Sequence, residues 1–253
     1  SGAGLVAVAA IESIVGGAAV ETVVLAASGQ YAIDSINTVL GAAGQDTLTL
    51  LAGQALAVNQ IESVIGSSAA DTVAMLTSGT LAVAGVERVL GTTGAESLVF
   101  LEAGSTGVTQ IEIVIGTSGV DTVTMLGGES LQISQIERLL GSVWSDTVNL
   151  LGGGRLELTA VDRVLGSSAS DTVVLVGGTT LSVSAIDQLI GSTANDTVTF
   201  LGVDSIAISA IETVFGTALA DTLVLVGSGN VSVSGIETVL GSDAVQTVTM
   251  LTA

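Results

Sequence analysis

The sequence predicts an all-β fold, a right-handed parallel β-solenoid, on the strength of three observations. The first is a period of 25 residues that runs along the whole chain without an insertion. The second is the alternation of short segments rich in Val, Ile, Leu and Thr with clusters of Gly and Ser. The third is the presence of 33 glycines and no proline, which suits tight corners between strands whose backbone N–H groups are all used. A strict period of this length is typical of stacked repeat units.

Each 25-residue unit begins at Ile or Val, and a glycine follows five residues later. The units begin at Ile11, Ile36, Ile61, Val86, Ile111, Ile136, Val161, Ile186, Ile211 and Ile236. The glycines are Gly16, Gly41, Gly66, Gly91, Gly116, Gly141, Gly166, Gly191, Gly216 and Gly241. We therefore expect a single β-solenoid domain over residues 1–253, with a partial turn at 1–10, nine full turns over 11–235 and a partial turn at 236–253.

The unit 161–185 shows the strands that we expect in each turn. Its apolar segments are VDRVL at 161–165, DTVVLV at 171–176 and LSVSA at 181–185, and the small-residue linkers GSSAS and GGTT join them. This pattern predicts three short strands per turn and about ten turns in the chain. Each strand is expected to pair in parallel with its own copy one turn later, about 4.8 Å away. The right hand follows from the general preference of parallel crossovers.

Alternation along the second segment of the unit predicts the core. Val173 and Leu175 share one side of the strand, and Leu175 belongs to a column that is large and apolar in every unit. That column is Leu25, Leu50, Met75, Phe100, Met125, Leu150, Leu175, Phe200, Leu225 and Met250. Two pairs of adjacent apolar residues, at 164–165 and 175–176, do not fit simple alternation. In each pair, either a bend places both side chains inside, or one faces outward and forms an apolar stripe, which normally marks an association surface.

The charge balance excludes several functions. The chain has 24 acidic residues, four arginines, no lysine, no histidine and no cysteine, and its net charge is −20. This composition argues against nucleic acid and anionic membrane surfaces as partners. The longest uncharged runs, such as the one over 47–61, are too short to span a bilayer as a helix. We expect no enzyme, because there is no His, Lys or Cys and the carboxylates of note recur from unit to unit.

Most of the acidic residues fall in two columns of the repeat. The second residue of the unit gives Glu12, Asn37, Glu62, Glu87, Glu112, Glu137, Asp162, Asp187, Glu212 and Glu237. The eleventh gives Glu21, Asp46, Asp71, Glu96, Asp121, Asp146, Asp171, Asp196, Asp221 and Gln246. Carboxylates stacked about 4.8 Å apart repel by roughly 0.9 kcal/mol per pair even in water. Either bound cations or hydrogen bonds from N–H groups of the corners are therefore expected to stabilise them.

The segment before the eleventh residue has a recognisable motif. It reads G-x-x-x-x-D-T-[VL], for example at 41–48 and 116–123. This motif resembles the glycine-rich nonapeptide of RTX (haemolysin-type) proteins, in which a corner and its Asp bind Ca²⁺. The resemblance implies Ca²⁺ ligands at Asp46, Asp71, Asp121, Asp146, Asp171, Asp196 and Asp221. It also implies type I secretion from a Gram-negative bacterium, a route used by adhesins, surface-layer proteins, toxins and enzymes. The alternative role for these acids is structural, with each carboxylate accepting N–H bonds from its own corner.

A third column consists of hydroxyl residues at the twelfth position of the unit. It contains Thr22, Thr47, Thr72, Ser97, Thr122, Thr147, Thr172, Thr197, Thr222 and Thr247. A regular Thr array can order water, which makes ice binding a candidate function. Threonine ladders also simply suit the faces of β-sheets.

The function that the sequence favours is structural or adhesive. Residues 1–10 already follow the repeat and the last residues are still in phase, so no irregular turn caps either end. We expect self-association, end to end or side by side, in a filament, a surface layer or a large secreted adhesin. A cell-surface glycan or protein is a further candidate partner.

The acidic, cysteine-free composition fits a bacterial cell surface or the extracellular space. The start at Ser1, without a signal peptide, suggests a processed product or a fragment. A calcium-binding module is the second hypothesis, and an ice-binding solenoid is the third.

Overall fold

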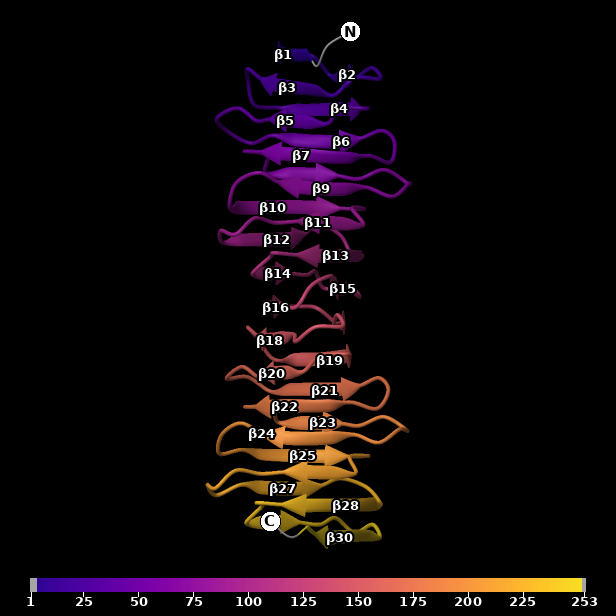
Figure 1. Cartoon of the computed structure of the whole chain (residues 1–253), viewed down its shortest axis with the longest axis vertical. Coiled ribbons are helices and arrows are strands. Elements are labelled where there is room, and N and C mark those ends of the chain that lie inside the picture. Colours follow the sequence, from indigo (N-terminus) through magenta and orange to yellow (C-terminus); the bar gives the residue numbers. More distant parts are fainter. Residues whose placement is uncertain (1–3, 252–253) are drawn as a thin grey trace. The chain divides into compact units, whose positions relative to one another are not determined.

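The computed structural model describes residues 4–251, which form thirty β-strands and no helix. The chain divides into two compact units, Ser1–Leu126 and Gly127–Ala253. Within each unit, successive strands follow one another as stacked layers (Figure 1). The first unit contains β1 (Gly4–Val8), β2 (Ser13–Val15), β3 (Glu21–Leu25), β4 (Gln30–Asp34), β5 (Thr38–Leu40), β6 (Thr47–Leu50), β7 (Ala55–Asn59), β8 (Ser63–Ile65), β9 (Thr72–Met75), β10 (Gly79–Ala84), β11 (Arg88–Leu90), β12 (Glu96–Phe100), β13 (Ser105–Thr109), β14 (Ile113–Ile115) and β15 (Thr122–Met125).

The second unit is built in the same way. It contains β16 (Ser130–Ser134), β17 (Arg138–Leu140), β18 (Thr147–Leu150), β19 (Gly154–Thr159), β20 (Arg163–Leu165), β21 (Asp171–Leu175), β22 (Thr180–Ser184), β23 (Gln188–Ile190), β24 (Thr197–Phe200), β25 (Ser205–Ser209), β26 (Thr213–Phe215), β27 (Thr222–Leu225), β28 (Gly229–Ser234), β29 (Thr238–Leu240) and β30 (Gln246–Met250).

In both units the chain passes alternately between two parallel sheets. Odd-numbered strands form one of them, the odd sheet, and even-numbered strands form the other, the even sheet. Each turn of the chain therefore contains two strands, which gives about fifteen turns in all. The register shows turns of unequal length, because Thr22 lies opposite Thr38 in the next turn, and Thr38 lies opposite Ala57. Every turn is thus shorter than the repeat unit of the sequence.

The prediction of a parallel β-solenoid with three strands in each repeat unit is confirmed, but the predicted turn is wrong. A repeat unit spans one and a half turns, so consecutive copies of a strand fall in opposite sheets. Val73 in β9 pairs with Leu56 in β7 and Val89 in β11, whereas Leu98, its copy in the next unit, lies in the even sheet. The expected ten turns, the three strands per turn and the pairing of each strand with its own copy are therefore not found.

The three strands of a unit are called the first, second and third strand, represented by β8, β9 and β10. Along the odd sheet their order is third, second, first, and along the even sheet it is first, third, second. Three kinds of corner join them. A loop corner (51–54) links a second strand to a third, a glycine corner (66–71) links a first strand to a second, and a left-handed corner (85–87) links a third strand to the next first strand. These three corners follow one another along the same edge of the solenoid.

The apolar core lies between the two sheets. The predicted column at the Leu175 position is buried as expected, except at Leu150, which is half-buried, and at Met250 in the last described turn. The second member of each adjacent apolar pair faces outward. Leu76 and Leu101, which follow second strands, are 48% and 52% exposed. The second of the two alternatives, an outward apolar stripe, is the one found, but it is divided between two edges because the copies alternate.

Candidate functional site

The glycine corner is the site that sequence analysis singled out, and its centre is a buried carboxylate. Asp71 is completely buried. Its Oδ2 accepts hydrogen bonds from the backbone N–H of Ser67, at 2.6 Å, and from the hydroxyl of Ser67, at 2.9 Å. Its Oδ1 accepts a third bond, at 2.9 Å, from the backbone N–H of Gln54 in the loop corner one turn earlier. One carboxylate therefore closes its own corner and ties it to the preceding turn.

The other predicted calcium ligands lie in the same setting. All seven aspartates, Asp46, Asp71, Asp121, Asp146, Asp171, Asp196 and Asp221, are fully buried. Each accepts a backbone N–H from the residue four positions earlier. The alternative structural role, an acid that caps its own corner, is thus confirmed. Among residues 4–251 no three or more Asp, Glu, His or Cys side chains form a group suited to a metal ion. Calcium binding stays a prediction.

Sequence analysis missed the hydroxyl residue that directly follows the corner glycine. Ser67, Thr117 and Ser167 each donate their hydroxyl to the aspartate four positions later. The signal was present, since eight of the ten units carry Ser or Thr at this position. Because hydrogen bonds to an ionised group are among the stronger ones in proteins, this hydroxyl helps to offset the cost of burying the carboxylate.

The acid at the second position of the unit completes the connection to the following turn. Glu87 in the left-handed corner accepts the backbone N–H of Asp71, at 2.7 Å from N to Oε2. The same contact joins Asp46 to Glu62 and Asp196 to Glu212. The two acidic columns are therefore one system. The glycine corner at 66–71 is held in this way by the loop corner before it and the left-handed corner after it.

The predicted ladders of equally spaced carboxylates are not found. On one edge, corners of the same kind recur every third turn, because the three kinds alternate. Acids of one column are therefore roughly 14 Å apart along the edge. At that distance the repulsion between them is weaker than at the expected spacing of about 4.8 Å, because the Coulomb energy falls with distance. Acids are instead adjacent in pairs, such as Asp71 and Glu87, and a backbone N–H lies between the members of a pair.

The glycine column is explained by close packing between corners. A Cβ at Gly166 would lie 1.8 Å from the backbone oxygen of Ala185 in the left-handed corner of the next turn. Ala185 has a positive φ of 56°. This conformation is uncommon for a residue with a side chain, and it turns the carbonyl group over the glycine. The N–H of Gly166 donates to the oxygen of Ser184, at 2.8 Å. Only glycine leaves room for this approach.

The hydroxyl column does not form one continuous line. Thr72 lies in the odd sheet, between Ala55 and Arg88, whereas its copies Thr47 and Ser97 lie in the even sheet. Each outer face therefore carries a Thr or Ser of this column only at every third rung. Ice binding stays a prediction, and the contiguous threonine array on which it was based is not found.

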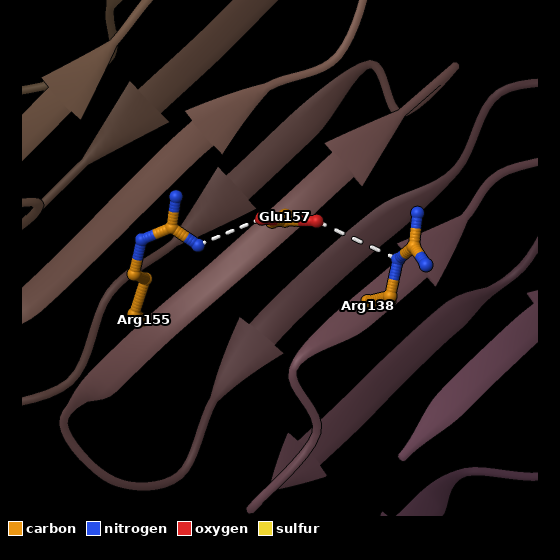
Figure 2. Close-up of polar contacts among 3 residues, drawn as sticks. All are labelled: Arg138, Arg155 and Glu157. Atoms are coloured by element: carbon orange, nitrogen blue, oxygen red, sulfur yellow. Dashed lines mark hydrogen bonds and ion pairs between the residues drawn. The ribbon is translucent and has the colours of Figure 1, made fainter. Parts of the chain in front are cut away.

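The outer face of the odd sheet carries a small ion cluster. Figure 2 shows Glu157 in β19 between Arg155 of the same strand and Arg138 of β17. The Oε1 of Glu157 is 2.8 Å from Nη1 of Arg155, and its Oε2 is 3.5 Å from Nε of Arg138. The hydrogen bond from Arg155, together with the charges of both arginines, lowers the pKa of Glu157. Exposed pairs of this kind contribute little to stability.

Asp204, in a loop corner, is a buried acid whose surroundings disfavour its charged form. Its side chain is 8% exposed, and Oδ2 has no hydrogen-bond partner. Burial and the charge of Asp221 raise the pKa of Asp204, although the N–H of Ala185 donates to its Oδ1. The carboxyl group of Asp204 therefore binds its proton more tightly in the folded chain than in the unfolded chain. Stability falls as pH rises through the interval between the ordinary and the raised pKa of Asp204.

We expect Asp204→Asn to stabilise the protein at pH 7 by up to about 1 kcal/mol, because it removes a poorly solvated buried charge. Urea denaturation at a series of pH values measures the effect. The difference between variant and parent should shrink as pH falls from above the raised pKa of Asp204 to the usual pKa of aspartate, and it should stay small below that pH. A variant that is less stable than the parent at pH 7 would show that the charge of Asp204 is favourable.

Comparison with protein-family models, curated proteins and solved structures found no match to this chain. The similarity of the corner to the RTX nonapeptide therefore stays a prediction from its residues. Within the described residues, no helix is long and apolar enough to cross a membrane.

Proposed function

We propose that this chain is a structural protein, an extracellular solenoid that associates with other copies of itself in a filament, a surface layer or an adhesin. The observation that carries the proposal is that the buried aspartates accept hydrogen bonds from the backbone of the corners. Each of the seven aspartates that suggested a binding site is fully buried and accepts a backbone N–H of its own corner. Six of them, all but Asp171, also accept a backbone N–H from the preceding turn. The buried carboxylates and the N–H groups that donate to them therefore recur along the repeat and connect one turn to the next.

The exterior supports self-association. Most acids lie at the corners, while the outer faces carry mainly Thr, Ser, Ala and aliphatic residues. Large aliphatic side chains are exposed at the ends of the second strands, among them Leu51, Leu101 and Leu151, each about half exposed. Faces with little charge can approach one another, whereas the acidic corners repel. Repeated exposed aliphatic residues are typical of association surfaces.

Sedimentation velocity and negative-stain electron microscopy over a wide range of protein concentration test this proposal. Experiments are done at physiological or higher salt, because a net charge of −20 opposes contact between copies at low salt. A structural self-associating protein is expected to form filaments, sheets or bundles as concentration rises. A chain that stays monomeric at the highest concentration, with its fold intact by circular dichroism, contradicts the proposal.

A further inference from the structure

We propose that the glycine corner around Trp144 is part of a binding site for a neutral glycan, in which a sugar ring packs on the indole ring. The inference goes beyond the proposed structural role and does not depend on self-association. Trp144 is the one tryptophan of the chain, and it is 62% exposed. The preceding residue, Val143, is 90% exposed. Tryptophan is among the residues that contribute most to binding energy where it is covered by a partner.

The fold does not require an indole ring at this position. Trp144 is the ninth residue of its repeat unit, and the other nine units have Ala, Gly or Leu there. The packing contact of this position involves only the Cβ atom, because a Cβ at Gly128, in the loop corner one turn earlier, would lie 2.7 Å from Cβ of Trp144. A Cβ at Gly178 would lie 3.0 Å from Cβ of Ala194 in the same way. Alanine therefore satisfies the packing, and the ring of Trp144 is available to a ligand.

Trp144 lines an open groove within the second compact unit. The groove lies over the left-handed corner at 160–162, between the glycine corner at 141–146 and the loop corner at 176–179. The left-handed corner is shorter than its two neighbours, which leaves room above it. The volume of the groove is about 610 Å³, within the range of about 300–1,000 Å³ that is usual for small-molecule sites. The groove over the left-handed corner at 60–62 measures about 220 Å³ and has no aromatic residue.

The other residues of the groove offer hydrogen-bonding groups. Asp162 is exposed, and its Oδ2 accepts the N–H of Asp146, at 2.8 Å. Among the described residues nothing donates to its Oδ1, so this oxygen can accept from a ligand. Ser145, Thr179 and Thr180 also line the groove, and hydroxyl groups both donate and accept. The lining therefore combines an aromatic ring, a carboxylate oxygen and three hydroxyl groups.

This combination is complementary to a pyranose ring. One face of such a ring consists of C–H groups, whose slight positive charge suits the negative face of an aromatic ring. The rim of the sugar carries hydroxyl groups, which donate strong hydrogen bonds to a carboxylate and exchange weaker ones with serine and threonine. A groove that is open to solvent also accommodates one part of a longer sugar chain.

The charges beside the groove favour a neutral ligand. Asp162 is followed by Arg163, which is also exposed, so the two formal charges at this place balance. A cationic ligand would contact the indole ring and the carboxylate, but it would meet the charge of Arg163 and make little use of the hydroxyl groups. An acidic glycan is disfavoured by the net charge of −20. A neutral sugar uses the ring, the carboxylate and the hydroxyl groups together.

Titration of the full chain with soluble hexasaccharides of glucose, mannose, galactose and N-acetylglucosamine tests the site. Because Trp144 is the one tryptophan, its fluorescence reports directly on the groove. At least one of the four sugars should shift the emission in a saturable way, and calorimetry should give the same affinity. The absence of a shift with all four, at concentrations up to about 10 mM, would overturn the inference.

Trp144→Ala should weaken sugar binding, measured by calorimetry, by at least about tenfold, because it removes the surface on which the sugar ring packs. Its melting temperature should stay close to that of the parent, since five other repeat units have alanine at this position. Leu219→Ala is the matched control. Leu219 is the ninth residue of another repeat unit, is 55% exposed and does not line the groove, so this variant should bind like the parent. Equal binding by Trp144→Ala and the parent would contradict the site.

The remaining outcomes separate this inference from the proposed function. A fluorescence shift with tetramethylammonium and with none of the sugars would mean that the groove binds cations, and the glycan site would be wrong. If no sugar binds and Trp144→Ala loses the self-association of the parent, Trp144 is a contact between copies, which supports the proposed function and overturns the glycan site. If a sugar binds at Trp144 while the parent stays monomeric at every concentration, the glycan site stands and self-association is wrong.

Discussion

Gly166→Ala is expected to destabilise the second unit by about 3 kcal/mol or more. The new Cβ would lie 1.8 Å from the oxygen of Ala185 and 2.9 Å from Oδ2 of Asp171. Neither atom can move freely, because Ala185 belongs to the backbone of the next turn and Oδ2 of Asp171 accepts two hydrogen bonds from Ser167. The corner must therefore open, which also breaks the bond from Gly166 to Ser184.

Denaturation in urea, followed by circular dichroism, measures this loss. Gly152→Ala serves as the control, because a Cβ at Gly152 meets nothing within 4 Å, and it should change stability by less than about 0.5 kcal/mol. Hydrogen exchange should locate the damage around residues 163–190, since each turn of a repeat protein contacts chiefly its neighbours. Equal stability of the Gly166→Ala and Gly152→Ala variants would mean that the close approach of the corners does not exist.

Asp71→Ala is expected to cost about 3 kcal/mol, because it leaves three partly buried donors without an acceptor. These donors are the N–H groups of Gln54 and Ser67 and the hydroxyl of Ser67. Each buried donor that loses its partner costs about 1–3 kcal/mol. Asp71→Asn retains one acceptor oxygen and should fall between the alanine variant and the parent.

Equilibrium unfolding of the two Asp71 variants checks this prediction, with Glu157→Ala as the control for loss of a carboxylate. Glu157 belongs to an exposed ion cluster, so its removal should cost at most about 1 kcal/mol. If Asp71→Ala were as mild as Glu157→Ala, the buried carboxylate would not hold the corners together.

The sequence predicted the strands of this fold but not their partners. The period, the three strands of each unit and the column at Leu175 all follow from local signals, namely alternation and glycine-rich corners. Pairing depends on whether the chain turns after two strands or after three. All three strands of a unit place apolar residues on one side, and all the linkers are short and rich in small residues. Nothing local distinguishes a two-sided from a three-sided coil.

The predicted aspartates do lie at glycine corners, and the error in the turn changed which residues are their neighbours. In the predicted coil each turn is one repeat unit, so Asp46 and Asp71 would be neighbours in adjacent turns. In the structure they lie on opposite edges, and the neighbour of Asp71 is Glu87. The positive φ in the left-handed corners was not predictable, because eight of the ten described residues at that position are not glycine. The conformation is imposed by the turns on either side.

Cysteine cross-linking tests the two-sided coil most directly, and the chain contains no cysteine of its own. Thr72 and Arg88 are opposite each other on adjacent strands of the odd sheet, while Ser97, the copy of Thr72, lies in the even sheet. The pair Thr72→Cys with Arg88→Cys should react rapidly with a short thiol-to-thiol cross-linker, since parallel neighbours are about 4.8 Å apart. The pair Thr72→Cys with Ser97→Cys should not react within one molecule. Cross-linking of the second pair and not the first would contradict the unit of one and a half turns and restore a coil in which each turn is one whole repeat unit.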